Sequence, residues 1–208
     1  MDFIVNFFAK GGGFMYPILL ALIAGFAIII ERAIYIMVKC RIDSVAFVNR
    51  ILEFIQRDNL KSAIEFCGMS QAPIARIMRF GLIEATKPNG DIQGAFESAT
   101  LAEIPKLEKR TPYLSTISNI STLLGLLGTI FGLIASFEAV SVADAATKAT
   151  LLSAGISQAM NTTAFGLIAA IPCMVGYAVL QEKVNELIDE INQHVSVVYK
   201  RLATARSH

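Results

Sequence analysis

The polar side chains inside the longest apolar stretches of this sequence are mostly hydroxyls and amides, and they recur with a helical period. In the second of three such stretches, small and hydroxyl residues follow one another at intervals of three and four residues. At about 100° per residue they share one face of a helix, opposite a face of Leu, Ile and Phe. The residues of this stripe are Ser115, Ser118, Thr122, Gly125, Thr129, Gly132 and Ser136.

Two interpretations of the stripe remain open. In one it is a packing seam, with Gly128 and Gly132 forming a small-x-x-x-small contact and Gly166 of the third stretch packing closely as well. In the other it lines a space filled by water or a partner, because hydroxyls that face lipid are costly unless they bond back to their own helix. The seam is the commoner arrangement, but the stripe is longer than one contact point needs.

The third apolar stretch is polar on more than one side. The residues that point about 120–160° away from Thr163 are Ser157, Gln158 and Asn161. Either Gln158 and Asn161 bond neighbouring helices while Thr163 faces a pore, or the reverse. Thr162 is a further candidate for a polar pore or helix contact, and Pro172 predicts a kink that frees a backbone carbonyl.

The second and third stretches lack the residues that usually carry protons or charge, since residues 117–137 and 151–180 contain no Asp, Glu, Lys, Arg or His. A carrier of protons within a membrane normally uses an ionisable group, so another polypeptide would have to supply it. The chain has two histidines and three scattered cysteines. These provide neither a nucleophile with its base nor a metal-ligand cluster, so we expect no enzyme, metal or cofactor.

The composition places the helices in a membrane. The chain of 208 residues is 54% hydrophobic and 17% charged, against about 25% charged residues in soluble domains. Most charges lie in residues 39–110 and 181–208, whereas the apolar stretches 14–38, 117–137 and 151–180 are long enough to cross the bilayer among membrane lipids. A net charge of +1 leaves no basic surplus for binding nucleic acid.

Lys and Arg predict the orientation, because cytoplasmic segments retain them. They are abundant in the middle segment and the tail, which places the N-terminus outside the cytoplasm and the C-terminus inside it. The first crossing is interpreted as an anchor, since no cleavage site for a signal peptide follows it. We expect an all-α integral membrane protein with three transmembrane helices extended into a cytoplasmic helical bundle. Its segments are a periplasmic N-terminal segment (1–13), transmembrane helices (14–38, 113–137 and 151–180), a cytoplasmic helical domain (39–112), a periplasmic loop (138–150) and a cytoplasmic C-terminal helix (181–208).

Two motifs carry a family resemblance. Gly-Leu-Leu-Gly-Thr-Ile-Phe-Gly at 125–132 and Thr-Ala-Phe-Gly-Leu-Ile-Ala-Ala-Ile-Pro at 163–172 together resemble the paired signature of the MotA/TolQ/ExbB proton-channel family. Three crossings with a large insert before the second are similar to its ExbB/TolQ branch. The resemblance implies an inner-membrane pentamer around an ExbD/TolR-like single-crossing subunit, whose membrane Asp is protonated and deprotonated as protons flow inward.

The same resemblance assigns roles to individual residues. Thr129 and Thr163 match the family's threonines that face the partner's Asp. Many ExbB sequences have Glu where this chain has Gln158, which cannot take up a proton near neutral pH. The implied function is a proton-driven motor that couples proton flow, through TonB or TolA, to envelope work such as outer-membrane transport. The alternative is a structural membrane scaffold that recruits cytoplasmic partners without ion flux.

Overall fold

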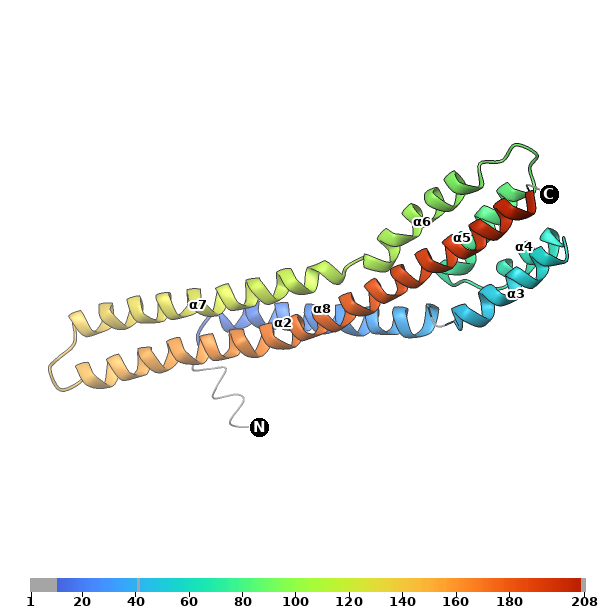
Figure 1. Ribbon diagram of the computed structural model, residues 1–208. Helices are drawn as coiled ribbons and strands as arrows, with labels where there is room; N and C mark the ends of the chain where they lie inside the picture. Colours follow the sequence, from blue (N-terminus) through green and yellow to red (C-terminus); the bar gives the residue numbers. More distant parts are fainter. Residues whose placement is uncertain (1–10, 41, 207–208) are drawn as a thin grey trace. The chain divides into compact units, whose positions relative to one another are not determined.

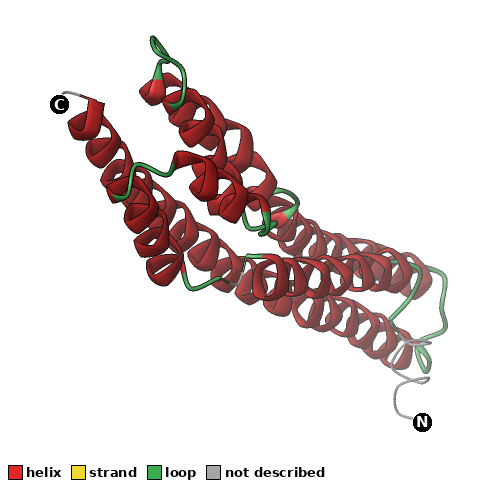
Figure 2. Ribbon diagram, turned by 90° about the vertical axis from the view of Figure 1, so that its right-hand side faces the viewer, coloured by secondary structure: helices red, strands yellow, loops and turns green. Residues whose placement is uncertain are grey.

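A computed structural model describes residues 11–40 and 42–206 of the chain (Figure 1). Every regular element in this part of the chain is helical (Figure 2), which confirms the all-α prediction. The elements are α2 (Met15–Ile34), the π-helix η1 (Tyr35–Lys39), α3 (Ser44–Gln56), α4 (Leu60–Gly68), α5 (Pro73–Ala85), α6 (Ile92–Glu108), α7 (Thr111–Ser141) and α8 (Lys148–Arg206).

Three apolar segments of the described residues are long enough to cross a membrane, as the sequence predicts. They lie in Met15–Val38, Ile92–Ser141 and Lys148–Ala205. Much of their apolar surface is uncovered, and Leu20, Leu123 and Ile171 are each at least 60% exposed. Large apolar side chains can stay uncovered at low free energy when lipid replaces water around them. The protein is therefore a membrane protein.

The helix bounds differ in detail from the predicted segments. Helix α7 begins at Thr111, two residues before the predicted crossing. The predicted third crossing and C-terminal helix are one continuous element, α8, which runs from Lys148 to Arg206 with Pro172 inside it. The kink predicted at Pro172 does not end the helix.

Backbone contacts divide the described chain into two compact units. The apolar unit consists of Arg110–Val179 together with the described residues up to Glu31. The charged unit consists of Arg32–Lys109 together with α8 from Leu180 onward. Helices α2 and α8 each contribute residues to both units.

The charged unit has a core of its own. Helices α3 to α6 and the later turns of α8 bury apolar side chains, among them Ile51, Met78, Phe96 and Val184. Asp43, Asn59 and Asp91 cap the starts of α3, α4 and α6, because each side chain accepts a hydrogen bond from a backbone N–H of the first turn.

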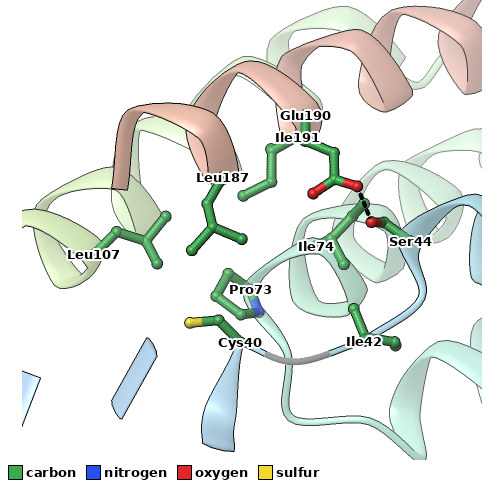
Figure 3. A pocket seen from close by; sticks show the side chains of 9 residues that line it. All are labelled: Cys40, Ile42, Ser44, Pro73, Ile74, Leu107, Leu187, Glu190 and Ile191. Atoms are coloured by element: carbon green, nitrogen blue, oxygen red, sulfur yellow. Dashed lines mark hydrogen bonds between the residues drawn. The ribbon is translucent and has the colours of Figure 1, made fainter. Parts of the chain in front are cut away.

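Polar contacts inside this unit join helices that are far apart in the sequence. The Ser44 hydroxyl donates to the carboxylate of Glu190 at the rim of a small, mostly apolar cavity (Figure 3). The buried Glu103 carboxylate accepts from Arg76 of α5 and from Lys106 of its own helix, both at 2.7 Å. The cavity is lined by Cys40, Ile42, Ser44, Pro73, Ile74, Leu107, Leu187, Glu190 and Ile191.

Candidate functional site

Helices α7 and α8 run side by side in the apolar unit and meet along small residues (Figure 1). A Cβ atom added to Gly166 would lie 2.8 Å from the carbonyl oxygen of Ser121 and 2.9 Å from the Cα of Gly125. At Gly132 it would lie 3.2 Å from the Cβ of Ala159. The backbones approach this closely because these positions have no side chain.

Hydroxyl groups bond across the same seam. Ser118 Oγ donates to the carbonyl of Ala170 at 2.9 Å, and Thr163 Oγ1 donates to the carbonyl of Gly125 at 3.1 Å. Ser136 is buried, and its Oγ lies 3.4 Å from the carbonyl of Leu151. The packing interpretation therefore describes one part of the stripe: Ser118, Gly125, Gly132 and Ser136.

The other part of the stripe lies beside the seam. Ser115, Thr122 and Thr129 recur every seven residues along α7 and are partly or fully exposed. Thr122 and Thr129 donate to carbonyls of their own helix, those of Ser118 at 3.1 Å and Leu126 at 2.6 Å. Thr163, partly exposed on α8, bonds to Gly125, which lies between Thr122 and Thr129 along α7. We call Ser115, Thr122, Thr129 and Thr163 the hydroxyl edge.

Helix α2 covers the opposite side of the α7 and α8 pair. Met15 and Ile18 of α2 form a buried cluster with Phe165 and Ala169 of α8, and Leu124 of α7 packs against it. Residues two apart on a helix point about 200° apart. Thr122 comes two residues before Leu124, and Thr163 two residues before Phe165. Both threonines therefore point away from α2. The hydroxyl edge is the side that α2 leaves uncovered.

The remaining polar residues of the third stretch have different surroundings. Thr162 is buried, and its hydroxyl donates to the carbonyl of Gly11 at 2.6 Å. Gln158 lies with its amide group beside Gly12. Ser157 is exposed and Asn161 partly exposed. The structure thus places Thr163 against Gly125, between Thr122 and Thr129 along α7, and places Gln158 and Thr162 beside the segment that precedes α2.

Sequence reasoning missed the residues that fit α2 onto this pair. A Cβ at Gly25 would collide with the sulfur of Cys173, and one at Gly176 would lie 2.7 Å from Ile29. Gly12 has a φ of 75°, in the left-handed region that favours glycine. The run of three glycines at 11–13 was the available signal.

The hydroxyl edge can donate hydrogen bonds to a carboxylate or accept them from a carboxylic acid, because each hydroxyl does both. It cannot hold a proton itself, since neither residues 117–137 nor 151–180 contain an ionisable side chain of the kind that carries protons. Together with three apolar spans, this defines a multi-pass membrane protein whose paired helices present polar but uncharged groups.

Comparison with known proteins identifies the family to which this membrane protein belongs. Residues 69–193 match the MotA/TolQ/ExbB proton channel family, and the chain belongs to it. It is 34% identical to biopolymer transport protein ExbB-like 3 of Synechocystis sp. over 197 residues, which cover 92% of each chain. It is also 32% identical to the Tol-Pal system protein TolQ of Haemophilus influenzae over 145 residues, 67% of this chain and 62% of that one. These relatives place it in the ExbB/TolQ branch.

Proposed function

We propose that this chain is an ExbB/TolQ-like subunit of a proton-driven motor in the bacterial inner membrane. Five copies surround an ExbD/TolR-type subunit that crosses the membrane once and carries a membrane Asp. The N-terminus of the present chain lies in the periplasm, while its C-terminus and the charged unit lie in the cytoplasm. The motor couples proton flow to TonB- or TolA-dependent work at the envelope. Membership of the family and the names of its relatives support this proposal.

The hydroxyl edge is the observation that carries the proposal. It is the side of the helix pair that α2 does not cover, and it has no ionisable residue of its own. A carboxyl group supplied by a partner would find hydroxyls there in either protonation state. The hydroxyls of Thr129 and Thr163 donate to backbone carbonyls, so they can accept from the protonated acid as they stand, and they would turn from these carbonyls to donate to the ionised acid.

Substitution of Thr163 tests this function. The full chain is reconstituted with its single-crossing partner in vesicles, and partner-dependent proton uptake is followed with a pH-sensitive dye. Thr163→Val keeps the shape of the side chain but removes the hydroxyl, so we expect uptake to fall at least tenfold while the mass of the complex stays unchanged. Ser121→Ala is the matched control, because Ser121 donates only to Ile117 of its own helix.

Two results would contradict the proposal. Undiminished uptake in Thr163→Val would exclude the role assigned to this hydroxyl. If the unmodified complex took up no protons with any single-crossing partner, the chain would instead fit the scaffold alternative.

A further inference from the structure

The segment that precedes α2 is fastened to both helices of the pair. Gly11 accepts a hydrogen bond from Thr162 of α8 at 2.6 Å. The Phe14 ring packs against Phe131 of α7, with ring centroids 5.3 Å apart. Between them, Gly12 lies so close to the Gln158 amide that a Cβ there would collide with it. We call residues 11–13 the glycine turn.

Thr162 is the residue on which these contacts converge. It is 1% exposed, and its methyl group fills the space that Gly128 of α7 leaves open. Its hydroxyl reaches the Gly11 carbonyl and, at 3.0 Å, the Gln158 carbonyl of its own helix. A single side chain therefore contacts the glycine turn, α7 and α8.

Thr162 and Thr163 hold opposite sides of the seam. Thr163 bonds to Gly125 at the hydroxyl edge, whereas Thr162 bonds to the glycine turn on the side that α2 covers. Because they are consecutive residues of one helix, a rotation of α8 that moved either hydroxyl would move the other. Fixing Thr162 therefore limits where the Thr163 hydroxyl can point.

We propose that Thr162 is a positioning residue for Thr163. Its hydrogen bond to the Gly11 carbonyl, which we call the clasp, holds the glycine turn against α8. The clasp closes the α2 side of this pair of threonines, so that Thr163 is reached only from the hydroxyl edge. The inference rests on the proposed function for the role of Thr163, but the clasp itself is a property of the chain.

Two substitutions separate the hydroxyl of Thr162 from its methyl group. Thr162→Val keeps the methyl against Gly128 and removes the donor, whereas Thr162→Ser keeps the donor and removes the methyl. Each is reconstituted as the full complex with its single-crossing partner. Hydrogen exchange of the backbone amides of residues 12–16 and 18 reports the clasp, and partner-dependent proton uptake over a range of pH reports Thr163.

We expect Thr162→Val to raise the exchange rate of these amides about fivefold, in line with the loss of one net hydrogen bond. Proton uptake should fall severalfold with an altered pH profile, at unchanged mass of the complex. Thr162→Ser should restore both measurements toward the unmodified values, and Ser121→Ala should change neither. Rescue by Ser separates positioning from general packing, since Ser restores the donor without the methyl group.

The outcomes are distinguishable from those of the proposed function. Unchanged exchange in Thr162→Val would overturn the clasp, and faster exchange with unchanged uptake would overturn the positioning role. If the unmodified complex takes up no protons, the proposed function fails, whereas the exchange comparison still decides whether Thr162 holds the glycine turn.

Discussion

A hydroxyl of the paired helices that donates to a carbonyl has a role that depends on which carbonyl it reaches. Ser118 donates to α8 and so joins two helices, whereas Thr122, one turn further on, donates back to the carbonyl of Ser118 itself. A bond within one helix satisfies the donor but adds no contact to a neighbour. Removing such a hydroxyl should therefore affect binding at the exposed edge more than it affects folding.

Thr129 provides the test at the scale of one residue. Its hydroxyl bonds only to Leu126 of its own helix at a partly exposed position, so Thr129→Val should change the free energy of unfolding by less than about 0.5 kcal/mol. Partner-dependent proton uptake should nevertheless fall severalfold. Ser118→Ala, which removes a buried bond between helices, should cost about 1 kcal/mol. Thermal unfolding and the uptake assay check both, and a Thr129→Val variant that fails to assemble would contradict this assignment.

The sequence predicts the hydroxyl stripe but not its division. Helical period places Ser115 to Ser136 within about 60° of one direction, and the structure keeps them on that face. Whether Ser118 or Thr122 is covered depends on where the axis of α8 lies, which the spacing within α7 does not contain. The bond between Thr162 and Gly11 joins residues 151 positions apart, and no local pattern encodes such a pairing.

At the scale of elements, α8 changes from apolar to charged at Leu180 but stays helical to Arg206. The sequence predicts a crossing at 151–180 and a separate C-terminal helix at 181–208 because charges begin there. The structure shows one helix, α8, since the change from apolar to charged residues at Leu180 introduces no Gly or Pro that would end it. Hydropathy thus locates the end of the apolar stretch without locating the end of the helix.

The crossing of Gly125 and Gly166 gives a prediction about the helix pair. Gly166→Ala would place a methyl group 2.8 Å from the Ser121 carbonyl, so the backbones must separate, and we expect a loss of about 1–3 kcal/mol in the free energy of unfolding. Gly13→Ala is the control, because a Cβ there has no neighbour within 4 Å. Unfolding in detergent measures both. Equal stability of the two variants would contradict the close crossing.

At the scale of the whole molecule, the two units differ in the polar groups that they bury and in how these groups are bonded. In the apolar unit, hydroxyls such as those of Ser118 and Thr163 donate to backbone carbonyls. The charged unit instead buries a carboxylate, Glu103, between Arg76 and Lys106. Its core is an ordinary helical one, and it contains Cys67, which is 1% exposed.

Cys67 links the stability of the charged unit to pH. Burial raises the pKa of its thiol to about 12, although the Arg79 charge opposes this change. In the unfolded chain the pKa of a thiol is about 8.5. Between these values the unfolded chain loses the proton first, so stability should decrease as pH rises from about 8.5. Replacing the thiol by Cys67→Ala should make this decrease shallower. Unfolding midpoints of the unmodified protein and of Cys67→Ala at pH 7.5 and at pH 9.5 test this. An equal decrease of the midpoint in the two proteins would refute it.

The way the hydroxyls of α7 and α8 are satisfied also bears on how a cell can produce this protein. A copy that has met no partner contains no Asp, Glu, Lys, Arg or His within residues 117–137 and 151–180, and the hydroxyls of Ser118, Thr129 and Thr163 already donate to its own backbone. It therefore has no group there that could shuttle protons and dissipate the gradient. We expect that a cell tolerates more copies of this chain than of the single-crossing subunit that carries the acid.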